Sequence, residues 1–337
     1  MLHYDAPPTV YAEALSDFLR ARFTGKIEGD LHPIALREAR DGTSIKAMIE
    51  RSLGGGELNG HEFVRALVNS NATFLFSEAL NFVIAGNLGH SEHRVLCATR
   101  DVPNFKTVGI ATVHVGDIAA SALGAVPSPV PAINVGGAGV TGQISLYSAG
   151  VNVARELLIN DDVDAVNAGV QEAARALLRE EAKLFAETLE GTSTLADGDP
   201  LFGATNSFTG GAPSVTSLDS AADMLATQAN SEGAKANAPL NSILIPSTKI
   251  ATVWTLNQAL GGKLKIVSSP FLSGSYWYGF SDPTAQPAVA RLRLSGRDVP
   301  TVEERRDLRY DGVQFRIEHA CGFRPFDRRG VVRVAFS

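Results

Sequence analysis

The chain has 337 residues, of which 45% are hydrophobic and 20% charged, enough apolar material for one large or two smaller buried cores. Its net charge of −6 argues against a general nucleic-acid binder. Cys97 and Cys321 are too few for a disulfide framework, so we expect both to be small buried residues in a reducing compartment. We find neither a signal peptide nor an unbroken apolar run, and therefore expect neither signal-directed export nor a membrane span.

The first quarter of the chain is predicted to be helical. Apolar residues recur at helical spacing over 9–23, and a second helix is expected from Pro33 to Leu53, before three glycines. A third helix is expected from His61 to Ala85. No strand partner is evident here, so this part forms helical segments joined by loops.

A segment almost free of charge follows. Between Thr107 and Ala154, Asp117 is the only aspartate, glutamate, lysine or arginine. Strands are expected over 107–115 and 141–150, with prolines and glycines between them, which predicts a long hairpin. An isolated hairpin is marginal in water and its uncharged edges attract other strands. We therefore expect this hairpin to lie against a partner surface.

The same segment contains Gly137-Ala-Gly139-Val-Thr-Gly142, a formal match to the dinucleotide fingerprint GxGxxG. That fingerprint requires a strand before it and a helix after it, whose N-terminal amides hold the pyrophosphate. Here three prolines precede it over 126–131, and strand alternation follows it over 143–148. We favour a flexible glycine-rich loop. A nucleotide-dependent enzyme using Gly137–Gly142 is the alternative from a different class.

The longest helix signal in the chain begins at Val163, after the candidate caps Asp161 and Asp162, and stops before Gly191. Beyond it the pattern is mixed. Helices are predicted near 217–230 and over 247–260, and strands over 242–246, 264–267, 277–280, 290–294, 313–319 and 331–336.

No pattern of catalysis, cofactor binding or metal binding stands out. No GxSxG nucleophile motif occurs, and His90 and His93 lack a third ligand, which predicts a surface turn. Glu180 and Glu181 are predicted to lie on a solvated or an interface face. We therefore predict a protein that is not an enzyme.

Arginine dominates the end of the chain. From Arg291 to Arg333 there are eleven arginines and no lysine, against seven acids. Two interpretations stay open: ion pairs within the chain on solvated strands, or an interface that uses the planar guanidinium fork.

Three stretches of this sequence resemble the major capsid proteins of tailed bacteriophages with the Hong Kong 97 fold, closest to the family of the phage Mu major head subunit. They are Val102-Pro-Asn-Phe-Lys-Thr107, Tyr147 to Asp162 with its Arg155-Glu156 pair before Ile-Asn-Asp-Asp, and parts of 240–283. The likeness covers 60–337, and Ile-Asn-Asp-Asp is its most specific element.

The resemblance implies an α+β fold of the Hong Kong 97 capsid type. Its parts are a helical N-terminal arm (1–85), a peripheral domain (86–106, 151–194 and 290–337, with a spine helix at about 163–190), an extended E-loop hairpin (107–150) and an axial domain (195–289). It also implies a virion protein, assembled in the bacterial host cytoplasm, whose copies form the hexamers and pentamers of an icosahedral shell. Packaged double-stranded DNA on the inner face, bound non-specifically, and portal, scaffold or decoration proteins are the other implied partners.

No cofactor, metal or membrane is implied. The residues expected at subunit contacts are Gly136, Gly137, Gly139, Arg155, Glu156, Arg297, Glu303, Glu304, Arg305 and Arg306. Some relatives join an E-loop lysine covalently to a neighbour's asparagine. No lysine occurs here between Lys106 and Lys183, so we expect no such bond. An encapsulin-type shell around cargo enzymes is the alternative within the same fold.

Overall fold

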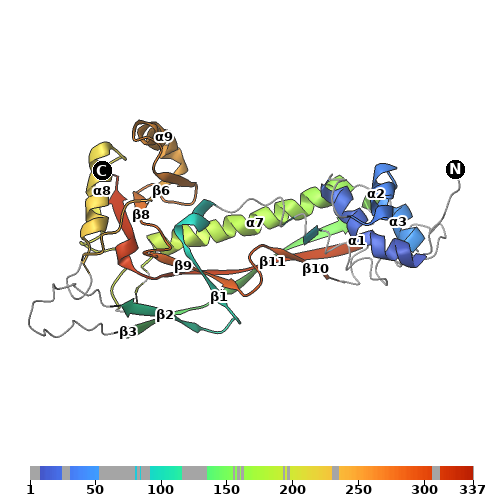
Figure 1. Cartoon of the computed structure of the whole chain (residues 1–337), viewed down its shortest axis with the longest axis horizontal. Coiled ribbons are helices and arrows are strands. Elements are labelled where there is room, and N and C mark those ends of the chain that lie inside the picture. Colours follow the sequence, from blue (N-terminus) through green and yellow to red (C-terminus); the bar gives the residue numbers. More distant parts are fainter. Residues whose placement is uncertain are drawn as a thin grey trace, which may run out of the picture. The chain divides into compact units, whose positions relative to one another are not determined.

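The computed structural model describes residues 8–24, 31–52, 80–81, 84, 92–115, 135–154, 156–157, 160, 163–192, 194–195, 198–229, 235–305 and 312–336. The chain forms two compact units. The first comprises Met1–Gly89, Leu146–Arg179 and Arg297–Ala320, and the second comprises His90–Ser145, Glu180–Gly296 and Cys321–Ser337. Helices and strands occur in both, as expected for an α+β fold (Figure 1).

Three short helices open the first unit: α1 (Pro8–Thr24), α2 (Pro33–Arg40) and α3 (Ile45–Ser52). The prediction of one helix from Pro33 to Leu53 was wrong. Gly42 adopts a positive φ of 70° and breaks the helix, and the Ser44 hydroxyl then accepts the Ala47 amide at the start of α3. Most of the helix predicted over 61–85 lies outside the described residues.

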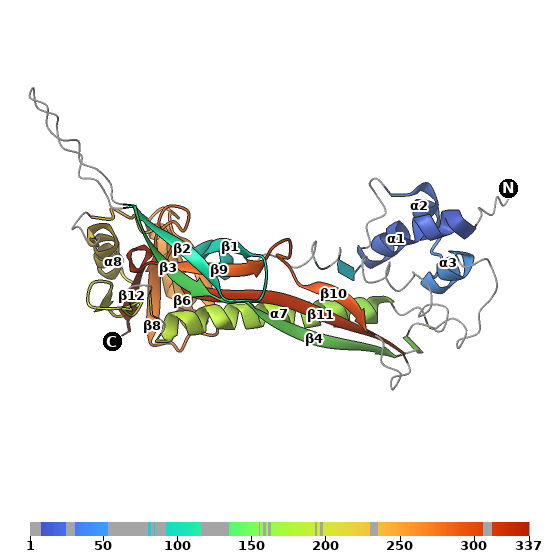
Figure 2. The same ribbon diagram turned by 90° about the horizontal axis from the view of Figure 1, so that it is seen from below.

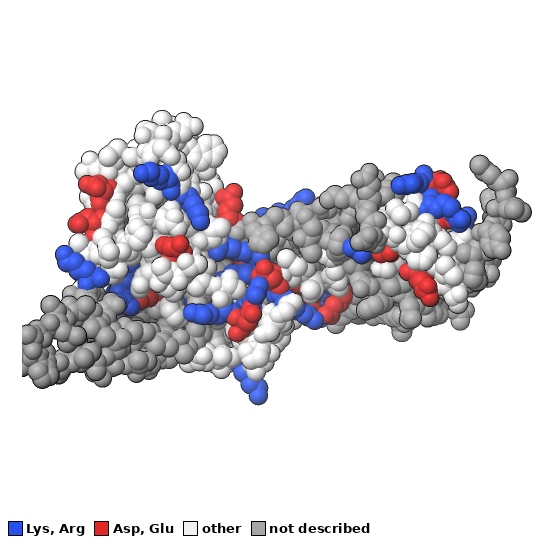
Figure 3. Space-filling view, in the orientation of Figure 1, with Lys and Arg blue, Asp and Glu red and all other residues white. Residues whose placement is uncertain are grey.

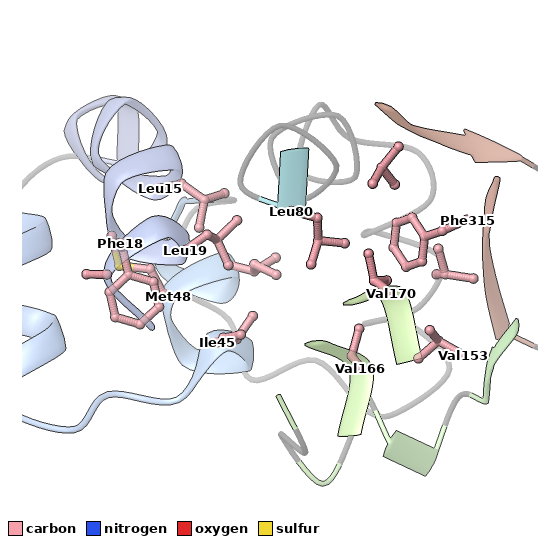
Figure 4. Close-up of a cluster of buried hydrophobic side chains, with 14 of the residues drawn as sticks. Leu15, Phe18, Leu19, Ile45, Met48, Leu80, Val153, Val166, Val170 and Phe315 are labelled. Carbon is pink, nitrogen blue, oxygen red and sulfur yellow. The ribbon is translucent and has the colours of Figure 1, made fainter. Parts of the chain in front are cut away.

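The core of the first unit joins these helices to elements far along the chain (Figure 4). Phe18 of α1 and Met48 of α3 are fully buried, as is Val170 of helix α7 (Val163–Glu190). Strand β11 (Gly312–Pro325) contributes Phe315, and strand β4 (Ser145–Ala154) contributes Val153. The bounds of α7 agree with the predicted spine helix.

The sheet of the first unit uses the N-terminal part of β11, which pairs antiparallel with β10 (Thr301–Arg305). Strand β4 also pairs with β11. At Val302 the side chain of Asn81 imitates a neighbouring strand, since its Nδ2 donates to the carbonyl at 3.1 Å and its Oδ1 accepts the amide at 2.5 Å. Strand β10 was not predicted.

The second unit contains a mixed sheet in the order β5-β12-β8-β6-β7. Helices α8 (Val215–Thr227) and α9 (Ile250–Ala259) pack on one face, around the fully buried Trp277. The C-terminal part of α7 packs on the other face through Phe185 and Leu189. The strands are β5 (Ser207–Thr209), β6 (Ser242–Pro246), β7 (Lys265–Ser269), β8 (Tyr276–Phe280) and β12 (Val331–Ala335).

A second set of strands in this unit is built on β9 (Val289–Leu294), which pairs in parallel with β1 (Ala98–Val102) and antiparallel with the end of β11. A short 3-10 helix, η1 (Glu92–Leu96), precedes β1. No helix within the described residues is long and apolar enough to cross a membrane.

Candidate assembly site

The charge-free segment forms a two-stranded antiparallel ribbon of β2 (Val108–Val115) and β3 (Val135–Gly142) (Figure 2). Among the described residues no third strand pairs with it. Three of the predicted contact residues lie in its ladder, with Gly136 opposite His114, Gly137 opposite Val113 and Gly139 opposite Ala111. Within the described part of the chain both strands are therefore edge strands.

The predicted position of the second hairpin strand was wrong. We expected it at 141–150 with the glycines in the tip, but the glycines belong to the paired strand over 135–142, and the alternation from Gln143 onward belongs to β4. Glycine weakens a strand but does not exclude one. Because glycine has no side chain, the glycines of β3 do not show the alternation of apolar and polar residues by which a strand is predicted. The structure also rules out the dinucleotide unit, because Gly142 is followed by a strand and not by a helix.

The base of the ribbon is fixed to the second unit. The Gln143 side chain donates from Nε2 to the carbonyl of Phe105 at 3.1 Å, which ties together the two ends of the ribbon. Ile144 is buried, with an exposed fraction of 1%. Below it the β11 backbone comes so close that a Cβ at Gly322 would lie 2.5 Å from the Gln143 carbonyl oxygen. Glycine at position 322 therefore permits the close contact between the β11 backbone and the base of the ribbon at Gln143 and Ile144.

A buried ion cluster lies deeper in the same unit. The Glu181 carboxylate is fully buried and accepts two hydrogen bonds from Arg94, at 3.0 and 2.6 Å, and one from Arg291 at 2.6 Å. The His93 Nε2 lies 3.3 Å from it, and the His93 ring stacks on Phe185. A buried carboxylate is stable only when it is paired, and the partners of Glu181 come from η1 and β9. The cluster therefore joins α7, η1 and β9 within this unit.

Two predictions fail at this cluster. Glu181 does not lie on a solvated or interface face, and His93 is not part of a surface turn, since both are buried; His90 lies outside the described residues. Cys97 and Cys321, by contrast, are buried as predicted. Burial raises the pKa of both thiols, that of Cys321 to about 12. Neither thiol is therefore a nucleophile at neutral pH.

The arginine-rich end contributes a second group of the predicted contact residues. Arg297 pairs with Glu303 at 3.6 Å and approaches the buried Glu318 at 4.0 Å. The Arg297–Glu303 pair forms within one chain. Both side chains are about half exposed, so the pair lies on the surface. In the β10–β11 ladder Glu304 is opposite Phe315 and Arg305 is opposite Gln314.

The remaining contact residues are not brought together by the structure. Glu156 is exposed, beyond the end of β4, while Arg155 and Arg306 lie outside the described residues. Among the described residues no cluster of histidine, cysteine, aspartate or glutamate is arranged to hold a metal ion.

The fold is an α+β fold of the Hong Kong 97 capsid type. The capsid of Ralstonia phage GP4 superposes with a TM-score of 0.51 at 10% identity, over 74% of this chain and 89% of that one. The SrpI encapsulin of Synechococcus elongatus PCC 7942 gives the same TM-score and identity, over 74% and 88%. Curated protein sequences contain no significant match.

The sequence model of the phage capsid protein family matches residues 138–334, which is more than half of the chain. The chain therefore belongs to the phage capsid protein family. It is a major capsid protein, a structural component of the virion and not an enzyme.

Proposed function

We propose that copies of this chain form hexamers and pentamers, and that these close into an icosahedral shell around double-stranded phage DNA. The observation that carries the proposal is the β2–β3 ribbon, which has no charged residue in its strands, no third strand among the described residues and a fixed base. Such a ribbon is marginal in water and gains stability when a neighbouring copy covers it. Because it lacks charges, covering it leaves no unpaired ion buried.

The proposal assigns the E-loop to 107–150, the axial domain to 195–289, the helical arm to 1–85, and the peripheral domain to 86–106, 151–194 and 290–337. Subunit contacts are assigned to the ten residues predicted above, from Gly136 to Arg306. DNA on the inner face, portal, scaffold and decoration proteins, assembly in the host cytoplasm and affiliation with the phage Mu head subunits belong to the same proposal.

Electron microscopy of the expressed and purified chain tests the shell. We expect closed particles tens of nanometres wide. Only monomers and amorphous aggregate, in several buffers and salt concentrations, count against the proposal.

The contents of the particle separate a phage shell from an encapsulin. Particles from infected or induced cells are treated with nuclease, opened, and analysed for nucleic acid and for co-purifying protein. Nuclease-protected double-stranded DNA of genome length supports the proposal. A stoichiometric enzyme cargo without DNA supports the encapsulin alternative.

A further inference from the structure

The second unit has an unusual separation of charge. From Leu184 to Ala234 the sequence has seven acidic residues and no lysine or arginine, whereas from Ala236 to Ser281 it has three lysines and no acidic residue. The structure places the helices of these two segments, α8 and α9, near opposite ends of one sheet. Helix α8 packs over β12, and α9 packs beside β7, with β8 and β6 between them. The charged residues of α8 itself are acidic, although the exposed Lys235 bridges to Ala229 just after the helix, and the charged residues that flank α9 are basic.

The outer stripe of α8 carries two exposed aspartates. Besides Val215 at the start of the helix, its exposed residues are Thr216, Asp219, Ser220, Asp223 and Thr227, which share one face. Hydroxyls in this stripe are satisfied locally, since Ser220 donates to the Thr216 carbonyl at 3.0 Å and Thr227 to that of Asp223 at 2.7 Å. The two carboxylates remain as the groups that attract a partner. In Figure 3 acidic side chains lie over α8.

The outer stripe of α9 is of a different kind. It consists of Ala251, Trp254, Thr255 and Gln258, and no charged residue occurs from Ile250 to Gly262. The Trp254 side chain is 57% exposed, and the Thr255 hydroxyl donates to the Ala251 carbonyl at 3.1 Å. A helix that faces water normally carries charge on its outer face. A single exposed apolar residue needs no explanation, but a whole charge-free stripe with an exposed tryptophan marks a contact surface.

Lysines border this uncharged stripe at both ends. Lys249 immediately precedes α9 and Lys263 follows it, and both are exposed. Lys265 has a second explanation, because it lies on the edge strand β7, where lysine discourages strand pairing. The α9 surface thus has an uncharged centre around Trp254 and a basic rim, and a polar rim around a less polar centre is common at protein interfaces.

We propose that the α8 stripe of one subunit docks on the α9 surface of a neighbouring copy. The occupant is a second copy because the two surfaces are complementary in charge and lie at opposite ends of the same layer. A contact between two different surfaces of identical chains repeats from copy to copy and closes into a ring when the rotation allows it. This inference rests on the proposed function, and it adds the residues that join the subunits within a ring.

Charge reversal tests the contact. One variant carries Asp219→Lys and Asp223→Lys, a second carries Lys249→Glu and Lys263→Glu, and a third combines all four changes. We expect the first two to remain folded, with an unchanged melting temperature of the free subunit, but to lose at least about tenfold in particle yield. The third restores the yield, because every contact again pairs opposite charges.

The outcomes distinguish this inference from the proposed function. Absence of particles from the unaltered chain counts against the shell itself. Normal particles from both two-site variants, beside normal particles from the unaltered chain, overturn the α8–α9 contact alone. So does failure of the four-site variant to recover although its subunit is folded.

Tryptophan fluorescence gives an independent readout, since the chain has only two tryptophans. Trp277 is fully buried and its Nε1 donates to the Gly211 carbonyl at 3.0 Å, whereas Trp254 is exposed. Acrylamide should quench Trp254 in free subunits and not in assembled particles, and a Trp254→Ala variant identifies the quenchable signal. Equal quenching of Trp254 in both states overturns the inference.

Discussion

At Gly322 the β11 backbone passes so close to the base of the ribbon that no side chain fits. A Cβ there would lie 2.5 Å from the Gln143 carbonyl oxygen and 3.3 Å from the Ile144 Cα, both of them backbone atoms. Neither atom belongs to a flexible side chain that can turn away. The position of the ribbon base therefore depends on one missing methyl group.

We predict that Gly322→Ala destabilises the subunit by about 1–3 kcal/mol, because the added carbon forces the two backbones apart. Urea unfolding measures this change. Gly150→Ala in β4 is the matched control, since a Cβ there meets no atom within 4 Å. Equal stability of the two variants would show that the ribbon base moves freely.

Glu38 of α2 is a second residue on which local structure depends. Its side chain accepts hydrogen bonds from Arg37 at 2.7 Å and Thr43 at 2.7 Å, and it also pairs with Arg51 of α3. Burial alone acts to raise the pKa of Glu38, but these partners outweigh burial and lower the pKa. The ionised carboxylate therefore holds α2 and α3 together.

Because the folded pKa lies below the unfolded one, this stabilisation is present above about pH 4.3 and is lost as the pH falls through the folded pKa. We predict that Glu38→Gln costs about 1–3 kcal/mol at pH 7 and much less at acidic pH. Urea unfolding at both pH values checks this, with the exposed Glu13→Gln as control. A cost independent of pH would mean that shape, and not charge, accounts for the role of Glu38.

Among the elements, helix α7 shows what the sequence can predict. An apolar stripe, acidic caps and a terminal glycine are all local signals, and its bounds were predicted correctly. The ribbon shows a failure of the same method, since its glycines predict a loop but lie in the paired strand β3. Glu181 shows a limit of another kind. Its partners Arg94 and Arg291 are 87 and 110 residues away along the chain, so no local pattern indicated its burial.

Strand β10 and the residues just before it contain the arginine-rich part of the candidate site, whose role in subunit contacts stays a prediction. Arg297 and Glu303 form an exposed pair within the chain, worth only ~0–1 kcal/mol if it stays in water. If copies bury this arginine-rich end against one another, loss of one partner costs on the order of 2–5 kcal/mol.

We predict that the double change Arg305→Ala and Arg306→Ala leaves a folded subunit with an almost unchanged melting temperature but lowers particle yield and makes it more sensitive to salt. Arg305→Lys with Arg306→Lys, which keeps the charge and loses the planar fork, should recover only part of the yield. Normal particle yield from the alanine variant would contradict the interface and favour ion pairs within the chain on solvated strands.

For the whole molecule, the absence of lysine between Lys106 and Lys183 bears on how a finished shell is held together. We predict that particles boiled in detergent run on denaturing gels as single chains of 35.6 kDa, or smaller if the N-terminal segment is trimmed. Subunits are then joined by non-covalent contacts alone. A ladder of multimers that resists reducing agent would contradict this.

The same scarcity of charge determines which proteases can attack the hairpin. Trypsin cleaves after lysine and arginine, and between Lys106 and Arg155 the chain offers neither, so the whole segment from Thr107 to Arg155 is released as one peptide of 49 residues or not at all. Trypsin-like enzymes therefore cannot cleave within the ribbon, even in an unassembled subunit. Only proteases that cut beside small apolar residues can report whether it is covered.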